Sequence, residues 1–269
     1  MKSRGWIWVI AVAVTLGSAV WQRMTGPTYP ARGTLVIGGA EFPLRLTRTH
    51  GGPGDQAIVL IIPDHRVTGE VAWRRYPTAD PWTTVPLRRN FDRLEAALPH
   101  QPVAAKLEYQ ARFHRGTEEA VFPERPAVTR FRNDVPAGVL IPHVAAMFLA
   151  MLFSTLAGLS ALGRFPQVRR DACSCGAFLG VGGFILGPLM QEIAFGAWWT
   201  GIPFGWDLTD NKTLFAAIAW AYALWAMRRG RVARGAIITA AVVTLVIFVI
   251  PHSTWGSELD WAALPGQGM

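Results

Sequence analysis

The chain has 269 residues, of which 51% are apolar and 16% are charged. Soluble domains carry about a quarter charged residues, so this composition argues against an ordinary soluble domain. The formal net charge of +8 would suit nucleic acid. Much of the excess, however, lies in short joints between apolar runs, where basic residues set the orientation of a protein in a bilayer. The composition therefore predicts a membrane protein and gives no reason to expect nucleic acid as a partner.

The first predicted element is the apolar run from Gly5 to Trp21, which Lys2 and Arg4 precede. Its roughly 17 residues are near the minimum for a helix that crosses the hydrocarbon core. A cleaved signal peptide is the alternative, because the segment Gly17-Ser18-Ala19 offers small residues for cleavage. Tryptophans at both ends of the run are typical of interface anchors. We therefore expect residues 1–25 to form a retained transmembrane anchor.

Residues 26–136 differ in composition, with frequent Gly, Pro and Arg and with apolar residues that alternate with polar ones. The clearest alternation runs from Leu107 to Phe113, and this period of two predicts a strand with one buried face. Shorter candidates are Leu35–Ile37, Leu44–Leu46, Ala57–Ile62, Val71–Trp73, Val85–Leu87 and Leu94–Ala96. Turn-like clusters of Gly and Pro separate them. About seven short strands in one segment predict a β-sandwich.

Within this segment, Tyr76 to Phe113 contains a strand ending in WTTVPL, a strand ending in LP and then a strand reading KLEY. This order resembles the middle of an immunoglobulin-like domain of the early-set or fibronectin type III kind. The resemblance implies an immunoglobulin-like fold for residues 30–133, with Tyr109 in the core. It implies nothing about function, because the fold hosts many functions.

Four apolar runs follow. Val139–Leu162 and Gly176–Trp199 are long enough to span a bilayer. Leu214–Met227 and Ala236–Ile250 are shorter and reach spanning length if flanking polar side chains extend into the interface. The alternative for the short pair is a buried helical hairpin in a soluble protein. We expect residues 137–252 to form a four-helix transmembrane domain, which with the anchor makes about five transmembrane helices.

Basic residues predict the sidedness. They gather in the joints Gly163–Asp171 and Arg228–Arg234, whereas the joint Thr200–Thr213 has one Lys and two Asp. The bias of Lys and Arg toward cytoplasmic loops places the N-terminus and both arginine-rich joints in the cytoplasm. Five spans then put the β domain and the C-terminal tail, residues 253–269, in the periplasm. The predicted fold is a membrane α-helical bundle with an inserted all-β immunoglobulin-like sandwich domain.

A second resemblance rests on five short segments: Gly26–Pro30, Leu98–Pro102, Phe204–Thr213, Pro251–Ser253 and Gly256–Asp260. With these segments the whole chain is similar to an uncharacterised family of bacterial multi-pass inner-membrane proteins. Since no activity is established for that family, the resemblance implies the architecture and the inner-membrane location alone.

Candidate functional residues cluster near the predicted outer ends of the spans: His143, Glu192, Asp207, Asp210 and His252. An ionisable residue in a membrane is a functional candidate because burying a charge there is unfavourable. The two His on different helices would suit a b-type haem or a metal, and Glu192 a proton or substrate role. The structural alternatives are interface histidines, a hydrogen-bonded Glu192, and Asp207 and Asp210 as helix caps, which we prefer.

Two further patterns concern packing and metal binding. Gly176, Gly180, Gly183 and Gly187 give one predicted span a face of small residues, which favours close approach of another helix or of a partner. Cys173-Ser174-Cys175 lies at the cytoplasmic mouth of the same span, and no second Cys pair exists in the sequence. We therefore expect no metal site there.

The predicted sandwich carries a group of arginines, Arg74, Arg75, Arg88, Arg89 and Arg93. They indicate either a solvated strand face or a surface for anionic headgroups or for an acidic partner domain.

The sequence contains no nucleophile–base set, no P-loop and no Gly-rich dinucleotide turn. We therefore expect a non-enzymatic accessory or structural subunit without a cofactor. It would dock on a larger membrane complex, respiratory or photosynthetic, with other membrane subunits and lipids as its partners. The alternative is a haem-bearing, metal-bearing or transport protein that uses His143, Glu192 and His252. An envelope sensor fits less well, because the cytoplasmic joints leave no room for an output domain.

Overall fold

A computed structural model describes residues 4–228, 232–252, 259 and 261. The chain divides into two compact units. The helical unit takes the described residues up to Gly26 and those from Val135 to His252. The β unit takes Pro27–Asp134 together with Leu259 and Trp261. In chain order the strands lie between the first helix and the later helices, and the fold is a mixed helix and strand fold.

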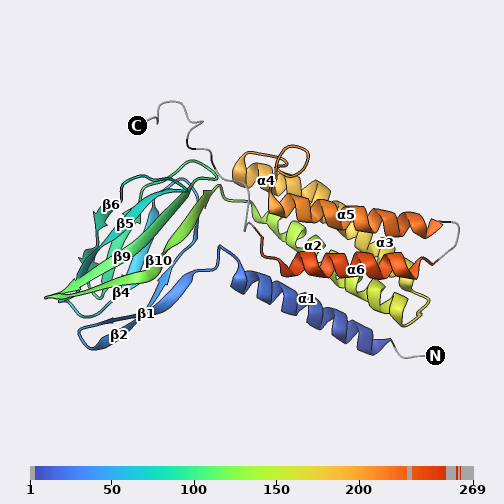
Figure 1. Ribbon diagram of the computed structural model, residues 1–269, viewed down its shortest axis with the longest axis horizontal. Helices are drawn as coiled ribbons and strands as arrows, with labels where there is room; N and C mark the ends of the chain where they lie inside the picture. The colour runs from blue at the N-terminus through green and yellow to red at the C-terminus, as the bar shows by residue number, and fades with distance from the viewer. Residues whose placement is uncertain (1–3, 229–231, 253–258, 260, 262–269) are drawn as a thin grey trace. The chain divides into compact units, whose positions relative to one another are not determined.

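The helical unit holds α1 (Gly5–Thr25), α2 (Ala137–Leu162), α3 (Val168–Leu179), the π-helix η1 (Gly180–Leu186), α4 (Gly187–Phe195), α5 (Leu208–Ala226) and α6 (Arg234–Val249). The segments α3, η1 and α4 follow one another without a break, and Figure 1 shows the helices side by side. Among the described residues, three helices are long and apolar enough to cross a membrane: α1, α2 and the continuous helix Val168–Phe195. α6 is apolar but shorter.

The interior of the helical unit is built from small residues, which allow helices to approach closely. Those buried in it include Ala150, Ala157, Ala161, Ala172, Ala216, Ala223 and Ala240. Trp220 on α5 is the largest side chain of this core, and its indole N–H donates to Thr244 Oγ1 on α6 at 2.8 Å. The outward faces are apolar as well, and Val9 on α1 is 70% exposed. Exposed apolar faces of this kind favour a non-aqueous environment, in agreement with a membrane protein.

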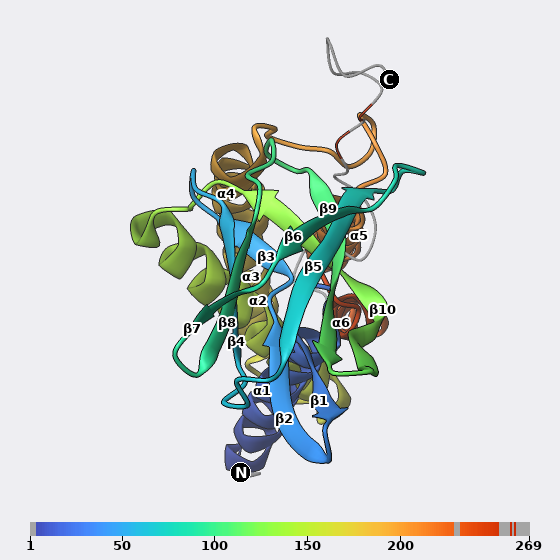
Figure 2. The ribbon, with the colours of Figure 1, turned by 90° about the vertical axis from the view of Figure 1, so that its left-hand side faces the viewer.

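The strands of the β unit are β1 (Ala31–Ile37), β2 (Ala40–Leu46), β3 (Thr49–Gly51), β4 (Gln56–Ile61), β5 (Thr68–Tyr76), β6 (Thr83–Pro86), β7 (Arg88–Asn90), β8 (Arg93–Leu98), β9 (Lys106–Arg115) and β10 (Glu118–Arg132). They form a sheet of β1 and β2, a sheet ordered β3-β10-β9-β5-β6, and a sheet ordered β4-β8-β7 (Figures 1 and 2). All seven predicted strand segments fall in or at the end of strands, so this prediction is confirmed.

The longest strand, β10, was not predicted. Pro123 and Pro126 interrupt its pattern, and its register against β9 shifts between Phe122 and Ala127. A proline cannot donate to the ladder and is tolerated at such a bulge, so the sequence signal of one long strand is broken in two.

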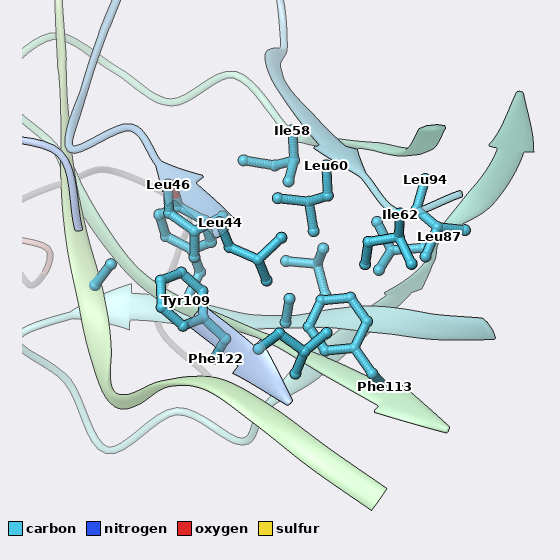
Figure 3. Close-up of a cluster of buried hydrophobic side chains, with 14 of the residues drawn as sticks. Leu44, Leu46, Ile58, Leu60, Ile62, Leu87, Leu94, Tyr109, Phe113 and Phe122 are labelled. Carbon is cyan, nitrogen blue, oxygen red and sulfur yellow. The ribbon is translucent and has the colours of Figure 1, made fainter. Parts of the chain in front are cut away.

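The sheets share one core. Ile58, Leu60 and Leu94 from the β4-β8-β7 sheet face Tyr109 and Phe113 from β9 (Figure 3). The buried positions of β4 and β9 alternate with more exposed ones, as the period of two predicts. Tyr109 is fully buried, as the resemblance implied, and its hydroxyl donates to the backbone oxygen of Thr47 at 2.5 Å.

Replacing Tyr109 with Phe removes this buried hydrogen bond and leaves the Thr47 oxygen without its donor. The β unit is therefore expected to lose about 1–2 kcal/mol of unfolding free energy. Chemical unfolding of the full chain, followed by intrinsic fluorescence, measures the change. An unchanged midpoint would show that the hydroxyl contributes nothing.

The acid dependence of the β unit rests in part on Asp64. It accepts hydrogen bonds from the backbone N–H and the guanidinium of Arg66 at 3.0 and 3.2 Å, and from Arg115 at 2.8 Å. The hydrogen bonds from Arg66 and Arg115 hold the pKa of Asp64 well below its usual range. A lowered folded-state pKa contributes stability that is complete above about pH 5 and is lost as the pH falls below about 4.

We therefore expect Asp64→Asn to flatten the loss of β-unit stability between about pH 5 and about pH 3. The exposed Asp92, whose side chain is 68% accessible, provides the control variant Asp92→Asn, which should keep the wild-type profile. Unfolding midpoints measured across this range test the prediction, and equal slopes for wild type and Asp64→Asn would contradict it.

The one described tryptophan of the predicted tail, Trp261, belongs to the β unit. Its indole N–H donates to the backbone oxygen of Tyr76 at 3.2 Å, and the Arg75 guanidinium lies 5.2 Å from its ring centroid. Apart from Leu259 and Trp261, the predicted tail, residues 253–269, lies outside the described residues.

Candidate functional site

The predicted polar cluster lies at the end of the helical unit where α5 begins and α6 ends. Asp207 is the N-cap of α5: its carboxylate accepts from the backbone N–H of Thr209 at 2.7 Å and of Asp210 at 3.3 Å. The free N–H groups and the positive end of the helix dipole favour a carboxylate at this position. Asp207 is only 5% exposed, so its carboxylate interacts with the start of α5 rather than with solvent.

Asp210 and Asn211 hold the preceding loop. Asp210 Oδ2 accepts from the backbone N–H of Thr200 at 2.6 Å and of Gly201 at 3.1 Å, and from the Thr200 hydroxyl at 3.2 Å. Asn211 Oδ1 accepts from the backbone N–H of Ile202 at 2.8 Å. Asp210 is therefore not a cap of its own helix: it satisfies buried backbone donors of the loop that folds over the helix start.

Lys212 and Gln22 bind the other helix end. The ammonium of Lys212 donates to the backbone oxygens of Ile250 at 2.7 Å and of Pro251 at 3.4 Å. The Gln22 amide donates to those of Phe248 at 2.8 Å and of Ile250 at 3.1 Å. The last carbonyls of a helix lack intrahelical donors and carry partial negative charge, so an ammonium is stabilised there.

Lys212 is 4% exposed. The expectation that polar residues beside Leu214 extend into the interface is therefore wrong for this side chain, which turns into the bundle. We refer to Gln22, Asp207, Asp210, Asn211 and Lys212 as the end clamp, because together they tie α1, α5, α6 and the 200–202 loop to one another.

His143 contacts the irregular part of the neighbouring helix. Its Nδ1 donates to the backbone oxygen of Gly182 at 3.0 Å, and the same oxygen accepts from the backbone N–H of Gly187, five residues on. This wide turn lies just before Pro188, which has no N–H and whose ring would collide with a carbonyl in regular α-geometry. The proline thus accounts for the π-helix, and His143 binds a carbonyl in it.

His252 is exposed and borders a cavity of about 10 Å3 that Lys212 also lines. The cavity has room for about one water molecule, whereas ligand pockets measure about 300 Å3 or more. The residues present do not fit a haem, and the described residues contain no group of three His, Cys, Asp or Glu placed to hold a metal.

Three other residues singled out in the sequence lie elsewhere in the helical unit. Glu192 on α4 is half-buried, and its carboxylate has no hydrogen-bond or ion-pair partner within the part of the chain that the structure describes. Cys173 is exposed and Cys175 is buried, and both are free thiols. None of the three lies in the end clamp.

The four predicted packing glycines do not form one contact face. A Cβ at Gly176 would meet the Leu224 side chain at 2.8 Å, and one at Gly183 would meet Thr213 at 2.6 Å. Both contacts are with α5, so these two glycines allow it to approach. Gly187 faces His143, and a Cβ at Gly180 meets nothing within 4 Å. Close approach of a partner at Gly180 therefore stays a prediction.

The structure adds a second cluster, at the opposite end of α1, that sequence reasoning missed. Asp171 on α3 is fully buried and forms an ion pair with Arg4, which precedes α1. Its carboxylate also accepts from the Ser160 hydroxyl at 2.9 Å and from Arg170 at 3.4 Å. We refer to Arg4, Ser160 and Asp171 as the base clamp. The available signal was that Asp171 is the one acidic residue in a basic joint.

Three of the five arginines grouped in the sequence bind other groups of the β unit. Arg74 pairs with Glu108 and Arg75 with Asp80, both at 2.5 Å. Arg89 donates to the backbone oxygens of three residues, Ile62, Asp64 and Val67. These three arginines stabilise the fold, so the interpretation of the group as a surface for headgroups or an acidic partner is wrong for them.

Comparisons of the chain with protein-family models, with curated proteins and with solved structures gave no match.

Proposed function

We propose that the helical unit spans a membrane five times, with α5 and α6 as additional spans. The two clamps support this. Arg4 and Gln22 lie at opposite ends of α1, about 27 Å apart at 1.5 Å per residue, and the hydrocarbon core is about 30 Å thick. The base clamp and the end clamp are thus separated by about one membrane thickness. Between the two clamps, α5 and α6 run beside the other helices (Figure 1). The bias of Lys and Arg toward cytoplasmic joints supports a cytoplasmic N-terminus and a periplasmic β unit in a bacterial inner membrane.

We also propose that the β unit is immunoglobulin-like. The sheet order β3-β10-β9-β5-β6, with β3 parallel to β10, and the facing sheet β4-β8-β7 agree with an immunoglobulin sandwich extended by an edge strand. In that correspondence β5 takes the place of strand C, which carries a core tryptophan in such domains. Trp73 on β5 packs against the core.

We infer that the chain is a non-enzymatic accessory subunit of a larger membrane complex. The observation that carries this is the end clamp: Asp207, Asp210 and Lys212 are buried and bind backbone groups of their own chain. These residues stabilise the helical unit itself. The exposed apolar helix faces, and Gly180 with open space beside it, remain available to a partner. A partner of respiratory or photosynthetic type remains part of the proposal.

Native-membrane purification tests this function. The tagged full chain is extracted in mild detergent, and its companions are identified by mass spectrometry together with an absorption spectrum of the same sample. We expect a stoichiometric membrane-protein partner and no haem absorption. A chain that always elutes alone would contradict the subunit proposal. A haem spectrum would favour the alternative that uses His143 and His252.

Gly180 offers a matched pair of variants for the docking surface. Because a Cβ there meets nothing within 4 Å, Gly180→Leu should keep the unfolding temperature yet lower partner recovery several-fold by filling the space where a partner helix would approach. Gly180→Ala should retain the partner. Equal recovery for both variants would exclude this face as the docking surface.

A further inference from the structure

Two arginines lie side by side on the outward face of the β1–β2 pair. Arg32 and Arg45 are direct partners in the antiparallel register, and both are exposed. The neighbouring inward positions Leu35 and Leu44 are buried in the core. Like charges directly opposite each other destabilise a strand pair, so this arrangement favours an anion between the two guanidinium groups.

No acidic residue compensates this pair. Among the described residues neither arginine forms an ion pair, in contrast to Arg74 and Arg75. Glu41 shares the outward face of β2 but lies four positions from Arg45, about 13 Å along the strand. Arg32 instead contacts an aromatic ring: its guanidinium lies 5.2 Å from the ring centroid of Tyr29. Tyr29 therefore orients one side of the pair without neutralising it.

A short stretch of chain connects the pair to the end of α1. α1 ends at Thr25, and Arg32 follows seven residues later, so it lies at most about 25 Å from that end. The strand register then brings Arg45 directly opposite Arg32. The headgroup layer begins where a spanning helix ends and is about 5–8 Å deep, and a tyrosine such as Tyr29 favours that layer.

We propose that Arg32 and Arg45 bind the phosphate of an anionic phospholipid headgroup on the membrane surface where α1 ends. A guanidinium donates two parallel hydrogen bonds to a phosphate, and two guanidiniums on adjacent strands can bind one phosphate from both sides. The site needs only that α1 spans the membrane. It does not depend on which side the β unit occupies or on the proposed role as a subunit.

Native mass spectrometry of the full chain in detergent tests the site, with phosphatidylglycerol and, in parallel, neutral phosphatidylcholine as added lipids. We expect phosphatidylglycerol to bind the double variant Arg32→Gln, Arg45→Gln about 30-fold more weakly than wild type, because each basic residue near an anionic surface contributes about fivefold. Phosphatidylcholine binding should not change. The exposed Arg93→Gln on β8 is the matched control and should bind as wild type does.

A second readout separates binding from folding. Without lipid, the double variant should unfold at the same temperature as wild type or higher, since a like-charge pair has been removed. Equal retention of phosphatidylglycerol by wild type and the double variant would overturn the proposal. So would inorganic phosphate that binds through both arginines while the lipid does not, because the ligand would then be a soluble anion.

Discussion

Replacing Asp171 with Ala is expected to destabilise the helical unit by about 3–5 kcal/mol, the range found when one partner of a buried ion pair is removed. The Asp171 side chain is fully buried, and that of Arg4 is only 15% exposed. Without the carboxylate, the Arg4 guanidinium keeps its charge in a mostly buried place without an acidic partner, and the Ser160 hydroxyl loses its acceptor.

Thermal unfolding in detergent, followed by circular dichroism at a helix wavelength, measures this loss. Arg170→Gln is the control: Arg170 also contacts Asp171, but its side chain is 62% exposed, so its removal should change stability by less than about 1 kcal/mol. The double variant Arg4→Met, Asp171→Leu removes both charges and should recover much of the loss. If Asp171→Ala unfolds at the wild-type temperature, the ion pair does not hold α1 to the bundle.

The second large effect is expected at Asp210. Asp210→Ala removes the acceptor of two backbone N–H groups, those of Thr200 and Gly201. Each buried donor left without a partner is unfavourable by about 1–3 kcal/mol, so the loss should be about 3 kcal/mol or more. The 200–202 loop should then come away from the start of α5.

Limited proteolysis in the 196–206 segment and thermal unfolding test this result together. Asp210→Asn keeps one acceptor oxygen. It should lose less than half of the unfolding free energy that Asp210→Ala loses, and its proteolysis should be close to that of wild type. Rapid cleavage of Asp210→Asn at the same rate as Asp210→Ala would show that the negative charge, rather than the hydrogen-bond acceptor, holds the loop.

The two clamps bear on function as much as on stability. Each clamp joins residues from segments that are far apart in the sequence. Packing of the apolar helices brings these segments together. A transmembrane scaffold of this kind presents outward apolar faces to lipid or to a partner. The headgroup site proposed at Arg32 and Arg45 would attach the β unit to the same surface.

Local patterns in the sequence determined much of the architecture. The period of two located Leu107–Phe113 and the other predicted strands, because one face of each strand meets the core. The long apolar runs located α1, α2 and the helix that ends at Phe195, since length and apolarity are properties of the segment itself. Asp207 before an apolar helix was readable as a cap for the same local reason.

The tertiary structure decided the partners of the buried charges. Nothing in the sequence distance between Arg4 and Asp171, or between Lys212 and the carbonyl of Ile250, indicates a contact. Likewise, Arg74 and Arg32 look alike in sequence, yet Arg74 lies opposite Glu108 and Arg32 opposite Arg45. A charge interacts with whatever the fold places within a few ångströms of it, and strand register and helix packing set that neighbour.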